Sequence, residues 1–143
     1  MKKIFSRNIV LGASATLLMF SLTTYVKRIK FLTSSVIPSA RGQVTIKKYN
    51  NEKYAIKIKI DELAEVKKVE PSKNMYIVWM ESENLTVKNM GNIICDTGCI
   101  SSKFKAAFET VTAFKPTKIF ITAEDNANIP YPINQFLLET NRF

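Results

Sequence analysis

The amino-acid sequence predicts an all-β protein, an antiparallel β-sandwich preceded by one hydrophobic N-terminal helix. Several short segments alternate apolar and polar residues with a period of two, the pattern of half-buried strands. Two other segments are short, continuous apolar runs, typical of strands covered on both faces. No helical pattern of ordinary length follows residue 40. Together these observations favour two packed sheets.

Composition limits both the number of domains and the chemistry. A chain of 143 residues has room for one ordinary domain and a short appendage. Histidine is absent, which removes the commonest general base, the Ser-His and Cys-His nucleophile pairs and most zinc sites. No phosphate loop or paired catalytic motif is visible. We therefore expect a protein that is not an enzyme, with no metal, no cofactor and no identified small-molecule substrate.

The net charge of +9 is unevenly distributed along the chain. Residues 1–40 contain six basic residues and no acidic one, whereas the other 15 basic residues accompany all 12 acidic ones. The six basic residues bracket an uncharged run of 18 residues, Ile9–Val26. Such bracketing is typical of membrane topology and of anionic headgroups. We expect the membrane as a partner, and not nucleic acid.

Residues 1–30 are predicted to form either a signal peptide or a signal-anchor transmembrane helix, and the sequence leaves both alternatives open. The run Ile9–Val26 is at the lower length limit for a membrane span. Thr23-Thr24-Tyr25 is a poor cleavage site for a secretory signal. Either alternative places the following domain in the cell envelope, as an extracytoplasmic domain that is membrane-anchored, periplasmic or secreted.

Residues 31–40 are predicted to be an extended linker, because Pro38 holds Ile37 out of the helical region. The sandwich domain is expected over residues 41–143. A first hairpin follows, in which Val44 and Ile46 alternate with polar residues and the segment Tyr54–Ile60 alternates isoleucine with lysine. The residues after it, 61–68, are expected to cross between the sheets.

The run Met75–Glu81 contains the only tryptophan, Trp79, and predicts a central strand with both faces covered. Lys118–Ala123 predicts a second inner strand, and the isoleucines of the first hairpin are expected across the core from both. Further strands are expected at three places, residues 85–94, 104–109 and 135–140. A total of about seven short strands is typical of immunoglobulin-like sandwiches.

Several short motifs in this order resemble the extracytoplasmic C-terminal domain of anti-sigma-K factors. They are Tyr76-Ile77-Val78-Trp79-Met80, Asn89-Met90-Gly91, Phe120-Ile121-Thr122-Ala123-Glu124, and Pro130 and Pro132 before Leu137-Leu138. The resemblance covers roughly residues 41–143 and is similar to a stand-alone exported form found in Bacteroidetes-type bacteria. It implies a small β-sandwich in an extracytoplasmic setting, with Tyr76, Trp79, Gly91, Thr122 and Glu124 as its core motif residues.

The chain departs from that family at two places. Only eight residues precede the apolar run, and histidine is absent, so the cytoplasmic sigma-binding domain has no counterpart here. Asp125 stands where the family tends to have proline after the glutamate. The resemblance therefore implies fold and location, and it does not imply sigma-factor binding.

Three groups of residues are candidates for chemistry or binding. Cys95 and Cys99 form a Cys-x3-Cys loop, either a local disulfide or two unpaired thiols. The stretch Glu124–Asn128 offers oxygen ligands for calcium, although a polar turn explains it more simply. A carboxylate pair for hydrolysis would require convergence of side chains distant in sequence: Asp96, Glu109, Glu124 and Asp125.

Four lysines are expected on one strand face, which would contact anionic headgroups or acidic polymers or be merely solvated: Lys47, Lys48, Lys57 and Lys59. The sequence thus predicts a non-enzymatic binding or sensing module of the bacterial envelope, with an envelope protein as a further candidate partner. Two alternatives stay open, namely an inert structural accessory protein and an anti-sigma-type regulator that works through a partner protein.

Overall fold

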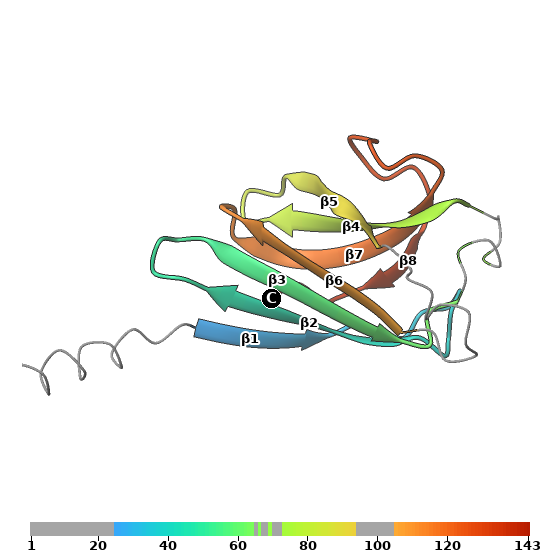
Figure 1. Ribbon diagram of the computed structural model, residues 1–143, viewed down its shortest axis with the longest axis horizontal. Coiled ribbons are helices and arrows are strands. Elements are labelled where there is room, and N and C mark those ends of the chain that lie inside the picture. The colour runs from blue at the N-terminus through green and yellow to red at the C-terminus, as the bar shows by residue number, and fades with distance from the viewer. Residues whose placement is uncertain (1–24, 65, 67–68, 70–72, 94–104) are drawn as a thin grey trace, which may run out of the picture.

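The computed structural model describes residues 25–64, 66, 69, 73–93 and 105–143. These residues form eight antiparallel strands in two four-stranded sheets that are stacked on each other (Figure 1). Sheet 1 has the order β1-β2-β3-β6, with β1 Tyr25–Lys30, β2 Arg41–Lys48, β3 Tyr54–Asp61 and β6 Lys105–Thr112. Sheet 2 has the order β5-β4-β7-β8, with β5 Val87–Ile93, β4 Met75–Ser82, β7 Pro116–Glu124 and β8 Phe136–Glu139. The predicted all-β antiparallel architecture is confirmed.

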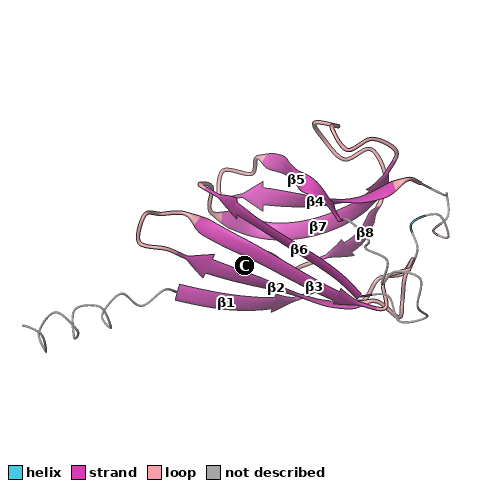
Figure 2. Ribbon diagram, viewed as in Figure 1, coloured by secondary structure: helices cyan, strands magenta, loops and turns pink. Residues whose placement is uncertain are grey.

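Strand dominates the described residues, as Figure 2 shows by its colours. The predicted first hairpin is the pair β2–β3, in which Val44 lies opposite Ile58 and Ile46 opposite Ile56. The chain then crosses from β3 in sheet 1 to β4 in sheet 2, as expected for the segment after Asp61. Strand β4 is central in sheet 2 between β5 and β7, and β7 is the other inner strand.

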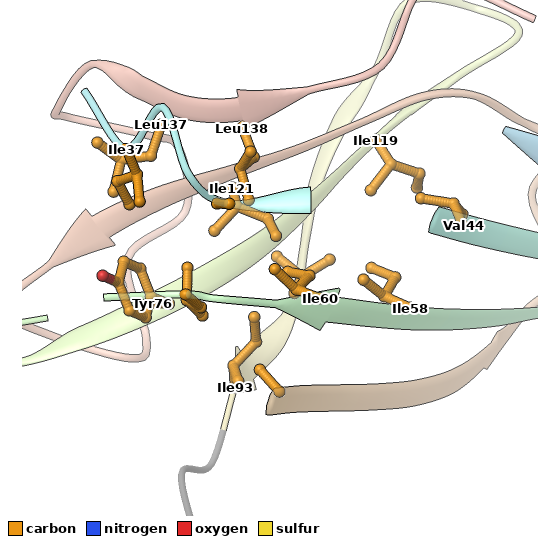
Figure 3. Close-up of a cluster of buried hydrophobic side chains, with 14 of the residues drawn as sticks. Ile37, Val44, Ile58, Ile60, Tyr76, Ile93, Ile119, Ile121, Leu137 and Leu138 are labelled. Carbon is orange, nitrogen blue, oxygen red and sulfur yellow. The ribbon is translucent and has the colours of Figure 1, made fainter. Parts of the chain in front are cut away.

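The main core lies between the two sheets (Figure 3). Sheet 1 contributes the inward isoleucine row of β3, and sheet 2 contributes Tyr76, Val78 and Met80 together with Ile119 and Ile121. Isoleucine and valine favour strands because a β-branched side chain packs well on the pleated surface. The predicted placement of the Ile56–Ile60 row across the core from β4 and β7 is therefore correct.

Trp79 does not belong to that core. It alternates with Val78 and Met80 along β4, so its ring lies on the opposite, outer face of sheet 2, where it forms a second cluster with Ile77 and Phe120. The ring is nevertheless fully buried, because the segment between β7 and β8 covers it through Ile129. Sheet 2 is thus covered on both faces, which explains why β4 is a continuous apolar run.

The predicted boundary at Arg41 is wrong, because the sandwich extends further toward the N-terminus. Residues Tyr25–Lys30, assigned by the sequence to the end of a signal or anchor helix, form edge strand β1 paired with β2. Ile29 packs against the core while Arg28 and Lys30, one residue to either side, lie on the opposite face, a period of two that the cluster of charges obscured. The earlier part of that predicted helix, residues 1–24, lies outside the described residues.

The predicted linker 31–40 is also part of the fold. Ile37 is only 4% exposed and lies in the core, and Ser34 Oγ accepts hydrogen bonds from the backbone N–H groups of Val36 and Ile37. Phe31 forms an isolated bridge with Thr140, just after β8. This segment therefore connects one sheet to the other.

Candidate functional site

Three residues of the sequence motif meet on the outer face of sheet 2. Trp79 Nε1 donates a hydrogen bond of 2.9 Å to Thr122 Oγ1, and Thr122 Oγ1 donates one of 2.8 Å to Glu124 Oε1. Residues 79 and 122 come from the paired inner strands β4 and β7. The Trp79 ring also stacks with Phe120 at 6.3 Å between centroids. The motif therefore joins an indole N–H, a hydroxyl and a carboxylate in one buried chain of hydrogen bonds.

Glu124 anchors the loop that covers this face. Its side chain is 1% exposed, and its Oε1 also accepts hydrogen bonds from the backbone N–H groups of Ile133 and Asn134 at 3.1 and 3.2 Å. Asn134 Nδ2 donates a further bond of 2.6 Å to Glu124 Oε2. The carboxylate thus accepts four hydrogen bonds inside the protein, three at Oε1 and one at Oε2, and solvent scarcely reaches it. The role of Glu124 here is to hold the loop in place.

Tyr76 and Gly91 have structural roles elsewhere. The Tyr76 hydroxyl donates a bond of 2.7 Å to the carbonyl of Ala64, and burial raises the pKa of this phenol well above its ordinary value. Gly91 has a φ of 127° beside a β-bulge in the β4–β5 pair. Asn89 Oδ1 accepts a bond from the Gly91 N–H, and its Nδ2 donates to the carbonyls of Ala127 and Ile129.

The other predicted chemistry is not assembled by the described residues. Cys95, Cys99 and Asp96 lie outside them. Glu109 is on sheet 1 and Glu124 on the outer face of sheet 2, so these two carboxylates do not converge. Asp125 is paired with Lys73 at 3.0 Å, and Asn126 Oδ1 accepts a bond from the Asn128 N–H. The stretch after Glu124 is thus a hydrogen-bonded polar turn.

The strongest surface feature is the outer face of sheet 1, which we call the basic face. Cross-strand neighbours in the register share a face, and two successive rows run across the four strands. One row contains Arg28, Thr45, Lys57 and Glu109, and the next contains Lys30, Gln43, Lys59 and Ala107. A shallow surface depression is lined by residues of both rows and of the strand ends beside them.

Basic residues far outnumber acidic residues on this face. The basic ones are Arg28, Lys30, Arg41, Lys47, Lys57, Lys59 and Lys105, and the acidic ones are Asp61 and Glu109. Within the part of the chain that the structure describes, only Lys57 of this set has a carboxylate partner within 4.0 Å, at 3.2 Å from Glu109. Arg41 donates instead to the carbonyls of Pro38 and Ala40, and the other basic residues of the set are exposed.

The sequence predicted part of the basic face correctly. Lys47, Lys57 and Lys59 lie on it, whereas Lys48 lies on the other side of the strand, with its ammonium 5.9 Å from the centre of the Tyr54 ring. Arg28 and Lys30 were missed because they were assigned to the flank of a membrane segment. The signal that could have revealed them is the alternation of Arg28, Ile29 and Lys30.

The fold and the basic face define an antiparallel β-sandwich with one strongly cationic sheet face. No known family model, curated protein or solved structure matches this chain. The resemblance to the anti-sigma-K domain therefore stays a prediction from the sequence. Across the described residues there is no group of three or more potential metal ligands of the His, Cys, Asp or Glu type. The same residues include no helix with the length and apolarity needed to span a membrane.

Proposed function

We propose that this protein is a non-enzymatic binding module of the bacterial envelope, and that its basic face binds an anionic partner. The observation that carries the proposal is the concentration of seven basic residues against two acidic ones on one face of sheet 1. Charges of one sign on a common surface attract a polyanion by several times the thermal energy. Scattered surface lysines would produce no such field.

The placement in the envelope rests on the sequence. The uncharged run Ile9–Val26, bracketed by basic residues, favours an N-terminal hydrophobic helix that anchors or exports the chain. The strand order accords with an immunoglobulin-like sandwich. The pairs β3–β6 and β4–β7 join strands that are not consecutive in the chain, because the chain passes from one sheet to the other between them. Such sandwiches commonly serve as extracellular binding domains.

A binding role also accords with the state of the buried polar groups. Among the described residues, no buried side-chain nitrogen or oxygen lacks a hydrogen-bond partner. Catalytic groups are commonly recognised by perturbed ionisation in a cleft, whereas the Tyr76 phenol, whose pKa is raised by burial, donates its proton to a hydrogen bond with the Ala64 carbonyl. The groups that remain free to bind a partner are the charged side chains of the basic face.

The first prediction tests anion binding directly. The full chain, held in a non-ionic detergent, is expected to bind inorganic polyphosphate with an affinity that falls steeply as salt is raised, because counterions are released from the polyanion. The variant Lys57→Gln with Lys59→Gln is expected to lose on the order of tenfold in affinity. Titration calorimetry at several salt concentrations measures both effects.

The matched control is Lys73→Gln with Lys118→Gln, which removes the same charge from other surfaces. Lys73 and Lys118 pair with Asp125 and Glu139 and lie away from the basic face. Their replacement is expected to leave polyphosphate affinity within about twofold, as for rim charges that make no contact. Equal losses in both double variants would show that net charge alone is responsible. Binding too weak to measure would favour the inert accessory role.

A further inference from the structure

The basic face is not uniform, since one end of it carries exposed apolar side chains. The register places Val26, Lys47, Ala55 and Val111 in a single row across the four strands of sheet 1. Val111 is 60% exposed and Val26 is 38% exposed. Tyr49, which directly follows β2 at the same end of the sheet, is 40% exposed. Val26 and Val111 thus place exposed aliphatic side chains at both edges of this end of the cationic surface, with Lys47 and Ala55 between them, and we call this row the apolar row.

The cationic rows follow this apolar row in order. Counting away from it, the next two rows carry Arg28 with Lys57, and Lys30 with Lys59. Successive residues on one face of a strand are about 7 Å apart, so the basic side chains begin less than a nanometre from the aliphatic ones. A surface with apolar groups beside basic groups has the amphipathic character of proteins that lie at a membrane interface.

The apolar row lies where the chain enters the sandwich. Strand β1 begins at Tyr25, and the uncharged run begins at Ile9, so Val26 of the apolar row is also the last residue of that run. No polar linker separates the run from sheet 1. Because Tyr25 and Val26 at the end of the run belong to β1, the part left for a membrane span is short, and a short span draws its flanking residues into the headgroup layer.

We propose that the basic face of sheet 1 docks on the surface of an anionic phospholipid bilayer, the same bilayer that holds the N-terminal run. Val26 and Val111 lie at the level of the headgroups, and Arg28, Lys30, Lys57 and Lys59 contact lipid phosphates. The inference rests on the proposed function and specifies its anionic partner. A soluble polyanion would satisfy the cations, but it would leave the aliphatic row in water.

Docking would also fix the orientation of the domain. Sheet 2 stacks on sheet 1 with the core between them, so its outer face points away from a surface that sheet 1 contacts (Figure 1). The loop between β7 and β8, with Tyr131 and Ile133 exposed, would then be presented to the surrounding envelope. Val87, on the outer face of sheet 2, would lie on the side remote from lipid.

The test uses the full chain in lipid nanodiscs, with methyl-labelled valine and a gadolinium chelate on a small fraction of the lipid headgroups. In equal parts of phosphatidylglycerol and phosphatidylcholine, the Val111 methyl signals are expected to broaden strongly and those of Val87 to stay sharp. In phosphatidylcholine alone, the broadening of Val111 is expected to fall. The variant Lys57→Gln with Lys59→Gln is expected to reduce the docked-to-free ratio on the order of tenfold, whereas Lys73→Gln with Lys118→Gln is expected to leave it unchanged.

Two outcomes would overturn the inference. Equal broadening of Val111 and Val87 would mean that the domain tumbles on its tether, and sharp Val111 signals in anionic nanodiscs would mean that it does not dock. If such a result came with intact, lysine-dependent binding to polyphosphate, the proposed anion-binding function would stand and its ligand would be a soluble polyanion. If polyphosphate binding were lost as well, both proposals would fail together.

Discussion

At the scale of single residues, the buried hydrogen-bond chain from Trp79 through Thr122 to Glu124 decides how the outer face of sheet 2 is closed. A buried indole N–H and a buried carboxylate are each costly without partners. Here the Trp79 N–H donates to the Thr122 hydroxyl, and this hydroxyl donates to the Glu124 carboxylate. The same carboxylate also accepts hydrogen bonds from the backbone N–H groups of Ile133 and Asn134. The residues that resemble a family motif therefore stabilise a loop and form no active site.

A prediction about Trp79 follows from this geometry. Trp79→Ala is expected to lower the free energy of unfolding by about 3–5 kcal/mol, because it leaves a cavity under the loop and removes the donor to Thr122. Trp79→Phe, which keeps most of the apolar volume, is expected to cost less, about 1–3 kcal/mol. Urea denaturation followed by circular dichroism measures both values.

The control for Trp79 is a large aromatic residue on the covering loop. Tyr131 is 66% exposed, so Tyr131→Ala is expected to change the free energy of unfolding by less than about 0.5 kcal/mol. A Trp79→Ala protein as stable as the parent would show that the outer face of sheet 2 is not closed in solution.

At the scale of elements, β5 shows how local irregularity adapts a strand to its neighbours. In β5 the register shifts by one residue between Val78 and Trp79 of β4, and the bulge lies beside Gly91. A Cβ atom at Gly91 would lie 3.3 Å from Cε2 of Phe108, a residue of β6 in the facing sheet 1. Gly91 thus serves the backbone conformation of β5 and also the close approach of β6.

Gly91→Ala is accordingly expected to destabilise the protein by about 1–3 kcal/mol, because its positive φ is unfavourable for a residue with a Cβ. The neighbouring change Asn92→Ala, in the same strand, is expected to cost less than about 1 kcal/mol. Thermal unfolding by calorimetry compares the two. Similar melting temperatures for Gly91→Ala and the parent would argue against the bulge.

At the scale of the whole molecule, the segment from Tyr25 to Ala40 connects the two sheets. Strand β1 completes sheet 1, the Phe31–Thr140 bridge reaches the end of sheet 2, and Leu32 N–H donates to the carbonyl of Glu139. Ala40 and Ile37 then enter the core. The sandwich therefore includes strand β1 and the residues expected to be a linker.

Truncation tests this boundary. A fragment of residues 25–143 is expected to fold, whereas a fragment of residues 41–143 is expected to unfold at distinctly lower urea, because it loses a strand and three buried residues and exposes the edge of β2. Amide hydrogen exchange of β2 in the two fragments gives a second measure. Equal protection in both would restore Arg41 as the start of the domain.

The sequence by itself determined most of the strands, though not β1, and it determined which face of β3 is buried and which is exposed. Period-two alternation of isoleucine and lysine is a local property, because successive side chains of a strand point to opposite sides. The continuous apolar run around Trp79 likewise predicted a strand that is covered on both faces. No local pattern in the sequence indicated that the side chains of Thr122 and Glu124 would be buried and hydrogen-bonded to each other.

Only the tertiary structure decided what covers each face and which charges share a surface. Trp79 lies on the outer face of sheet 2 because it alternates with Val78 and Met80, and it is buried there because the segment between β7 and β8 closes over it through Ile129. Arg28 and Lys30 join Lys57 and Lys59 because β1 pairs with β2, and β2 with β3. Sheet pairing brings together residues that are distant in the chain, and local periodicity carries no record of the partner.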